Sequence, residues 1–364
     1  MDAAEDKDSV NTPRAEGPGD ERLALPFRLQ RRGVVLRPDP SSPYERGGVL
    51  NPAVAQREGT TYILYRAVAV EPPNYSRILI AVCRTEADGT VTAHRLHRVA
   101  LEPQAPYELW ADGRGGGVED PRITPLEGAY YMAYTAYGSA GDDPSPMPRI
   151  ALARSDDLFN WERVGLAVFA PLSIQEGGRG APTAIDLNRV PDKDAILFPE
   201  RIGGRYCMMH RPMFPAHTGL RQSIWLSYSR DLMHWEDHRL VLAPTLSWES
   251  LKVGGGTPPL RTGYGWVTFY HGVEGASDAD PHRKYHAGVL VLDLADPAHV
   301  LYRSPQPVLS PESREETEGV VSNVVFPTGV VAHPGGQVDV YYGMADQAVG
   351  LATTRIPHSL PTAP

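Results

Sequence analysis

Short apolar runs, separated by Gly, Pro and charged residues, recur along the chain at a nearly constant spacing. One of them is an apolar pair, or a single valine, that leads into a proline, at Val35-Leu36…Pro38, Ala100-Leu101…Pro103, Val168…Pro171, Val241-Leu242…Pro244 and Val308-Leu309…Pro311. Successive prolines of this set lie 65, 68, 73 and 67 residues apart. Self-similarity at a fixed period is typical of repeat architectures, so the pattern predicts five copies of one structural unit.

Further runs predict more strands in every copy. A short strand carries an X-Pro step, at Asn51-Pro52, Asp120-Pro121, Phe198-Pro199, Pro258-Pro259 and Phe326-Pro327. An aromatic-rich strand follows at 61–66, 130–135, 206–211, 266–271 and 338–343, and an apolar strand comes next at 78–82, 150–153, 224–228, 287–292 and 349–353. Each copy therefore predicts four strands in about 70 residues.

Four-stranded sheets repeated around an axis are the blades of a β-propeller. The pattern predicts an all-β protein, a five-bladed β-propeller with four-stranded blades. A strand near 34–36 precedes the first complete copy, and the last copy lacks its fourth strand. We therefore expect the N-terminal strand to complete the last blade and close the ring. An eight-stranded sandwich is the alternative fold, but it does not explain the fivefold recurrence.

Composition agrees with many short strands joined by turns, because 35 of the 364 residues are Gly and 35 are Pro. The net charge of −9 argues against nucleic acid or an anionic membrane as the main partner. We expect residues 1–25, which are acidic and polar, to form a disordered arm without a signal peptide, and residues 26–364 to form the propeller domain. Cys83 and Cys207 lie in apolar, strand-like runs, so free thiols and a cytoplasmic location are expected.

Polar residues of the repeats are expected to converge, since the first strand of each propeller blade lines the central channel. The residues at these places are Asn51, Asp120, Lys193, Asp194, Lys252 and Asn323 near the first strands, Arg66, Arg211 and His271 at the ends of second strands, and Asp346 in the last copy. Several basic side chains on one axis repel one another unless an anion lies between them. The cluster predicts a bound phosphate, sulfate or carboxylate. His234 and His238 fall in a turn, and neither a metal site nor a cofactor is predicted.

These stretches resemble glycoside hydrolase family 130, the mannoside phosphorylases and related mannosidases built on five-bladed propellers. The similar motifs span about 48–356 and are Gly117-Val-Glu-Asp-Pro-Arg-Ile-Thr124, Lys193-Asp-Ala-Ile-Leu-Phe-Pro-Glu200, Met209-His-Arg-Pro212, Lys252-Val-Gly-Gly-Gly-Thr-Pro-Pro259, Phe269-Tyr-His-Gly-Val273 and Val324-Val-Phe-Pro-Thr-Gly329. The main departure is a Gly- and Pro-rich insertion between Asp142 and Asp192, which is expected to overhang the site.

The resemblance implies roles for the convergent residues. Asp120 corresponds to the general acid. Four residues correspond to positions that hold inorganic phosphate, namely Lys193, Arg211, Lys252 and His271. Asn51, Arg66 and Asp346 correspond to residues that bind the mannose next to the cleaved bond. The implied reaction is inverting cleavage of a β-mannoside, with the proton passing through a mannose hydroxyl and α-mannose 1-phosphate as the product.

Physical reasoning about the reaction agrees with the resemblance. Most glycosidases need two carboxylates, whereas a phosphorylase uses phosphate as the nucleophile and needs cations to hold it. The expected substrates are β-1,4-mannooligosaccharides, mannosyl-glucose or mannosyl-N-acetylglucosamine, with β-1,2-linked mannosides also open. A hydrolase of the same family and a non-catalytic sugar-binding propeller are the alternatives. A homo-oligomer is left open, since no interface signature is present.

Overall fold

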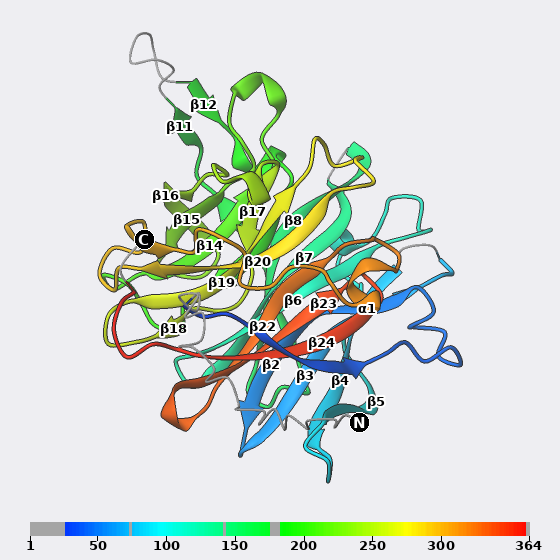
Figure 1. Cartoon of the computed structure of the whole chain (residues 1–364). Helices are drawn as coiled ribbons and strands as arrows, with labels where there is room; N and C mark the ends of the chain where they lie inside the picture. Colours follow the sequence, from blue (N-terminus) through cyan, green and yellow to red (C-terminus); the bar gives the residue numbers. More distant parts are fainter. Residues whose placement is uncertain (1–25, 73–74, 141–142, 175–182, 362–364) are drawn as a thin grey trace, which may run out of the picture.

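Strands make up nearly all of the regular structure in the computed structural model, which describes residues 26–72, 75–140, 143–174 and 183–361 (Figure 1). The expected N-terminal arm at 1–25 lies outside the described residues. Helical segments of the described chain are single turns: α1 (Arg314–Thr317), η1 (Pro106–Glu108), η3 (Leu187–Arg189), η4 (Ala216–Thr218), η5 (Ser247–Glu249) and η6 (Pro334–Gly336). The all-β class is therefore confirmed.

The strands form antiparallel groups that follow the predicted repeats. The first group is β2 (Gly48–Arg57), β3 (Thr60–Ala69), β4 (Tyr75–Thr85) and β5 (Val91–Leu101). The second is β6 (Gly117–Leu126), β7 (Ala129–Ala140), β8 (Asp143–Ser155) and β9 (Glu162–Leu166). The third is β13 (Asp192–Leu197), β14 (Tyr206–Pro212), β15 (Ile224–Ser229) and β16 (His234–Leu242). The fourth is β17 (Lys252–Gly255), β18 (Leu260–Arg261), β19 (Trp266–Glu274), β20 (Lys284–Leu292) and β21 (Val300–Arg303).

The first and last strands of the described chain meet in the fifth group. It contains β22 (Val325–Ala332), β23 (Gln337–Met344) and β24 (Ala348–Arg355), and β1 (Gln30–Leu36) pairs antiparallel with β24. The sheet order β1-β24-β23-β22 gives β1 the outer place that β5, β9, β16 and β21 occupy in the other groups. The predicted pairing of the N-terminal strand with the last copy is confirmed.

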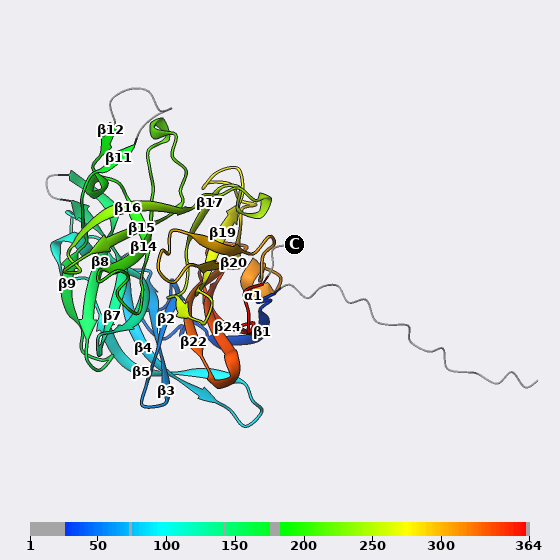
Figure 2. The same cartoon turned by 90° about the vertical axis from the view of Figure 1, so that its left-hand side faces the viewer.

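The predicted insertion is shorter than the sequence indicated. Residues 143–166 include β8 and β9, which are ordinary strands of the second group. The extra segment begins with β10 (Val168–Phe169), which pairs parallel with β16, and continues in the hairpin of β11 (Leu172–Ile174) and β12 (Thr183–Ile185). This hairpin stands out from the body of the molecule in two perpendicular views (Figures 1 and 2).

Apolar side chains pack between consecutive groups. One core joins the first and second groups, a second joins the second and third, and others join the third with the fourth and the fourth with the fifth. A further core places Val35 and Leu36 of β1 and Val349 of β24 against Val49 and Val54 of β2, so it joins the fifth group to the first. Valine, isoleucine and aromatic residues favour strands because they pack well on a pleated surface, and burial of their side chains holds neighbouring groups together.

Four groups contain the same buried polar cluster. A glutamate just before the first strand accepts hydrogen bonds from a tyrosine of the second strand and pairs with an arginine of the outer strand. The clusters are Glu45–Tyr65–Arg95, Glu108–Tyr134–Arg163, Glu249–Tyr270–Arg303 and Glu316–Tyr342–Arg31. The fifth group takes its arginine from β1, so the N-terminal strand supplies the same side chain as the other outer strands.

Both cysteines are free thiols, as predicted, with Cys207 buried and Cys83 partly buried. Among the described residues, no helix has the length and apolar character needed to cross a membrane.

The last of these clusters gives a stability prediction. Glu316 is fully buried and its carboxylate bonds Arg31, Tyr342 and two backbone N–H groups, whereas its neighbour Glu315 pairs with Arg37 in solvent. Glu316→Gln removes the buried counter-charge of Arg31 and leaves it only the exposed Glu312, so we expect it to lower the free energy of unfolding by about 2–4 kcal/mol. Glu315→Gln is the matched control and should change it by less than about 1 kcal/mol. Equal effects in urea denaturation would contradict the prediction.

Candidate active site

The first strand of each group, called the inner strand below, lies opposite the outer strand in its sheet. Three of these inner strands carry a short polar residue in an unusual backbone conformation. Asn51, Asp120 and Asp194 have positive φ angles of 46°, 48° and 59°, and each lies at a break in the antiparallel register. Asn and Asp tolerate this left-handed region better than other residues with a side chain, and a bulge re-aims the side chain that it carries. Asn323, just before β22, shares the conformation with φ of 62°.

The left-handed Asn or Asp, and not the X-Pro step, is the feature that these strands share. In the first two groups the left-handed residue precedes a proline, but Asp194 precedes Ala195, and Phe198-Pro199 lies four residues further on. What recurs in space is the left-handed Asn or Asp rather than the X-Pro step. The reason is that the bulge requires a particular φ angle, which these residues adopt with or without a following proline.

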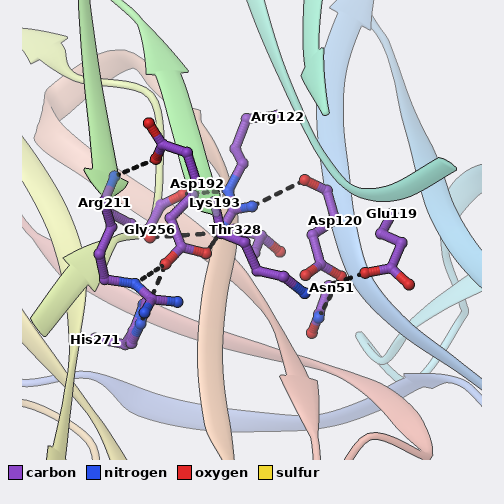
Figure 3. Close-up of polar contacts among 12 residues, drawn as sticks. Asn51, Glu119, Asp120, Arg122, Asp192, Lys193, Arg211, Gly256, His271 and Thr328 are labelled. Atoms are coloured by element: carbon purple, nitrogen blue, oxygen red, sulfur yellow. Dashed lines mark hydrogen bonds and ion pairs between the residues drawn. The ribbon is translucent and has the colours of Figure 1, made fainter. Parts of the chain in front are cut away.

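The inner strands lie side by side, so the side chains of different groups meet. β2 contacts both β22 and β6, β6 contacts β13, and β13 contacts β17. Figure 3 shows the result: Asp120, Glu119 and Asn51 lie on one side of Lys193, and Arg211 and His271 lie on the other. The predicted convergence of residues from several repeats is therefore observed.

Asp120 is buried and held by residues of the first group. Its Oδ1 accepts hydrogen bonds from Asn51 Nδ2 at 2.8 Å and from Arg66 Nη1 at 3.1 Å. Arg66 also donates to Glu119 Oε1 at 2.6 Å, and Lys193 Nζ donates to Glu119 Oε2 at 3.2 Å. Glu119 thus bridges the two cations that lie beside the predicted acid.

A second cluster surrounds Asp194. Arg211 Nε donates to Asp194 Oδ2 at 2.6 Å, and Arg122 Nη2 approaches Oδ1 at 3.4 Å. His271 Nε2 lies 3.6 Å from the same carboxylate. Gly254 is necessary here, because a Cβ on it would come within 2.4 Å of both Asp194 and His271. The glycine-rich stretch after Lys252 therefore makes room for a carboxylate rather than forming a phosphate loop.

Lys252 has a carboxylate partner of a different kind. Its Nζ contacts Asp278, whose side chain is 53% exposed and belongs to the loop between β19 and β20. Gln222, which also accepts a hydrogen bond from Arg211, donates to Asp278. Asp194 is enclosed by the protein, whereas Asp278 reaches the site from a solvent-exposed loop.

Neighbouring charges hold Asp120 in its ionised form. Burial by itself raises the pKa of this carboxyl, but the positive charges of Arg66, Lys193 and Arg122 outweigh burial and lower the pKa below its usual value. A general acid must carry a proton, so Asp120 needs an added negative charge nearby before it can serve in that role.

His271 differs from the expected cation. Burial, with the adjacent positive charges of Arg211 and Arg122, outweighs the attraction of Asp194 and lowers the pKa of His271 to about 3. The side chain is fully buried, and neither ring nitrogen has a hydrogen-bond partner among the described residues. Buried polar atoms are normally paired, so a neutral imidazole here is suited to a ligand that hydrogen-bonds to it.

Asp346 lies close enough to Asp120 and Arg66 for their charges to affect it. Burial raises the pKa of its carboxyl to about 6, with Arg66 opposing the rise and Asp120 adding to it. The three residues predicted to bind mannose, Asn51, Arg66 and Asp346, thus all lie in or beside the Asp120 cluster. The Oδ1 atom of Asn51 is buried and has no partner in the described chain.

The basic side chains do not depend on a bound anion to offset their mutual repulsion, although the sequence had suggested that they do. Three of them already have carboxylate partners: Lys193 pairs with Glu119, Arg211 with Asp194 and Lys252 with Asp278. The sequence interpretation gave no role to Glu119, Arg122 and Asp278 and placed Asp194 on the axis without a partner. Glu119 and Arg122 lie within the quoted Glu-Asp-Pro-Arg motif, so a search for counter-charges around Asp120 would have found them. Nothing in the local sequence marks Asp278, which a loop brings to Lys252.

Asp346 gives a prediction about pH. Its folded-state pKa of about 6 lies above the unfolded value, so the folded state binds the proton more tightly and stability falls as pH rises from about 4 to 6. Asp346→Asn removes this cost. The variant should be more stable than the parent by about 1–3 kcal/mol at pH 8, with the difference vanishing below pH 4. Lower stability of the variant at pH 8, measured by urea denaturation, would show that the ionised Asp346 carboxylate does not destabilise the folded state.

Comparison with known proteins identifies the family of this chain. The family model of glycoside hydrolase family 130, described as β-1,4-mannooligosaccharide phosphorylase, matches residues 30–360. A 1,2-β-oligomannan phosphorylase from Thermoanaerobacter sp. (strain X514) is 35% identical over 320 residues, covering 87% of this chain and 93% of the relative. A β-1,2-mannobiose phosphorylase from the same organism is 33% identical over 336 residues, covering 90% and 97%.

A solved structure shows the same fold. The β-1,2-mannobiose phosphorylase from Listeria innocua, in complex with β-1,2-mannobiose, superposes with a TM-score of 0.69 at 24% identity, covering 91% of this chain and 97% of that one. The match to the family model extends over all the groups of strands and over both clusters around Asp120 and Asp194. This chain belongs to glycoside hydrolase family 130.

Proposed function

We propose that the protein is an inverting phosphorylase that cleaves a β-mannoside with inorganic phosphate and releases α-mannose 1-phosphate. One observation carries the proposal. A buried carboxylate, Asp120, lies across Lys193 from a second cluster that holds Arg211 and His271, whose ring nitrogens have no hydrogen-bond partner among the described residues (Figure 3).

The roles follow from charge and position. Asp120 is the general acid for the leaving oxygen, and Asn51, Arg66 and Asp346 hold the mannose next to the cleaved bond. Lys193, Arg211, Lys252 and His271 hold phosphate in line with the anomeric carbon, so that its charge is offset before attack. Attack on the face opposite the leaving group inverts the anomeric centre.

Phosphate also supplies the negative charge that Asp120 needs. A dianion bound among these cations reduces the positive potential that lowers the pKa of Asp120, and so favours the protonated acid. The bond from C1 to the glycosidic oxygen breaks as a bond from C1 to a phosphate oxygen forms, and the proton of Asp120 goes to the leaving oxygen through a mannose hydroxyl. The phosphate ester then ionises and returns a proton to the carboxylate.

The two relatives that cover most of the chain favour β-1,2-linked mannosides as substrates, since both are named for that linkage. The family description names β-1,4-mannooligosaccharides, so these come second in the proposal, with mannosyl-glucose and mannosyl-N-acetylglucosamine after them.

The same proposal includes a single catalytic domain over 26–364, folded as a five-bladed propeller with a closed ring. The antiparallel groups of the described chain would be its blades. The core between the fifth and first groups and the pairing of β1 with β24 support closure. Contacts of β2 with both β6 and β22 support a shared axis.

Incubation with β-1,2-mannobiose and, separately, β-1,4-mannobiose, with and without phosphate, tests the reaction. We expect α-mannose 1-phosphate from at least one of them, only with phosphate, and a loss of at least about 10³-fold in kcat for Asp120→Asn. Free mannose regardless of phosphate would instead mean a hydrolase, with Asp346 as the candidate base. Sugar binding that Asp120→Asn leaves intact, without turnover by the parent enzyme, would mean a sugar-binding protein.

Asp278 gives a second prediction, because phosphate must compete with it for Lys252. Asp278→Asn removes the competing charge and keeps the size of the side chain. We expect the KM for phosphate to fall about 3- to 10-fold, with the KM for the mannoside changed by less than twofold. Asp278→Glu retains the charge and is the control. A higher phosphate KM for Asp278→Asn would mean that the loop carboxylate assists phosphate binding.

A further inference from the structure

The third group replaces the Glu–Tyr–Arg cluster of the other four with a different set of residues. His210 holds the register position of the tyrosines, since it pairs with Trp225 on the next strand as Tyr65 pairs with Leu79. Ser227 lies two residues beyond Trp225. At this place the other groups have Ala81, Ala153, Leu290 and Ala352, which pair with the cluster arginines.

These residues form one continuous chain of hydrogen bonds. Asp192 Oδ2 lies 2.6 Å from His210 Nδ1, and His210 Nε2 lies 2.7 Å from Ser227 Oγ. Ser227 Oγ lies 2.7 Å from His238 Nδ1, and His238 Nε2 lies 2.8 Å from the carbonyl oxygen of Ala170. The sequence of Asp, His and Ser is that of a hydrolytic triad, but Ser227 is fully buried in mid-strand and has no access to a substrate.

Counting donors shows that the chain needs one extra proton. Its four hydrogen bonds need four protons, and both ends, a carboxylate and a carbonyl, are acceptors. Two neutral imidazoles and one hydroxyl supply only three. The fourth proton must be on Asp192 or make one imidazole cationic, and in either case the complete network is electrically neutral. Without that proton, two acceptors face each other within the chain.

The surroundings favour the neutral network. His210 is fully buried, and the ring of Phe169 stacks on it with centroids 4.9 Å apart. Asn188 bonds both the backbone N–H and the carbonyl of Phe169, at 2.9 and 2.8 Å. Burial raises the pKa of Asp192, and burial lowers the pKa of His238. The extra segment after β9 therefore covers one end of the network and supplies its last acceptor.

Other charged groups lie near Asp192 and His238, the two ends of the network. Arg211 and Asp194 act on Asp192 with opposite signs, and Glu236 and Asp237 favour the charged form of His238. The other four clusters consist of glutamate, tyrosine and arginine and contain no histidine. The group with the histidine network is also the group that supplies Lys193 and Arg211.

A direct contact joins the network to the phosphate residues. Asp192 Oδ1 accepts the backbone N–H of Arg211 at 3.1 Å, and Asp192 is followed by Lys193, which pairs with Arg211 across β13 and β14. A change in the protonation of the network therefore acts on the backbone that carries both cations.

We propose that Asp192, His210, Ser227 and His238 form a positioning network that holds one proton and keeps Arg211 and Lys193 in place for phosphate. The proposal rests on the proposed function. Loss of the proton at alkaline pH breaks one link of the network and weakens phosphate binding.

Ser227→Ala tests it, because alanine occupies this register position in three other groups. The variant leaves only the bonds of Asp192 with His210 and of His238 with Ala170, which two neutral imidazoles satisfy without an extra proton. Phosphate Kd by calorimetry and the KM values for phosphate and mannoside are measured from pH 6.5 to 8.5. The ratio of variant to parent cancels the ionisation of phosphate itself.

We expect Ser227→Ala to raise the Kd and KM of phosphate about 3- to 10-fold at pH 6.5, with the mannoside KM changed less than twofold. The ratio should fall toward one as the pH rises and the parent loses that proton. Tyr342→Phe removes a hydroxyl from the cluster of the fifth group and is the control, with phosphate affinity within twofold throughout. His238→Ala opens the same chain at its partly exposed end and should repeat the result if Ser227→Ala folds poorly.

A ratio that stays constant with pH, equal changes in both KM values, or no change would overturn the network proposal. If the parent protein binds no phosphate by calorimetry, the proposed function fails with it. If the parent binds phosphate and the variants match it, only the network proposal fails.

Discussion

A charged side chain that leaves water must lie beside an opposite charge, because the uncompensated ion costs several kcal/mol. The arrangement of polar residues in this protein follows from that constraint. Each Glu–Tyr–Arg cluster buries a carboxylate against an arginine and a hydroxyl, and the inner strands bury Glu119 and Asp194 against Lys193 and Arg211. The same requirement makes β1 part of the fifth group, because Glu316 has Arg31 as its arginine.

Compensation inside the site limits how an anionic substrate can enter it. Asp194 is enclosed by the protein and pairs with Arg211 and Arg122. If either arginine left it for another anion, the buried carboxylate would lose part of its counter-charge. Asp278 is different because its side chain is half-exposed and can return to water. The site therefore combines fixed ion pairs, which set its geometry, with one pair on a loop that phosphate can replace.

The third group departs from the pattern of the other four at the place where it supplies phosphate residues. The other four groups use glutamate, tyrosine and arginine at this place, whereas the third group uses an aspartate, two histidines and a serine joined by hydrogen bonds. Phe169 and Ala170 of the extra segment complete this network. The segment thus has a structural connection to the site that its distance along the chain does not reveal.

Local sequence patterns determined the all-β class, the spacing of the strands and the alignment of Arg66, Arg211 and His271 at one register position. They could do so because strand periodicity and turn residues act over a few neighbours. The pairing of β1 with β24 also followed from counting strands. The five-bladed ring and the roles of the site residues stay predictions, supported by the contacts described above.

Tertiary structure alone decided which charges meet. The partner of Lys193 lies 74 residues away and that of Arg211 17 residues away, and the Coulomb interaction depends on distance in space rather than on position in the sequence. The sequence counted His271 among the basic residues, but burial keeps its side chain neutral. The sequence also gave no sign that hydrogen bonds connect Asp192, His210 and His238. Residue types and their spacing determined which ionisable side chains each strand carries. The packing of strands from different groups decided which of these side chains meet and which charge each one carries.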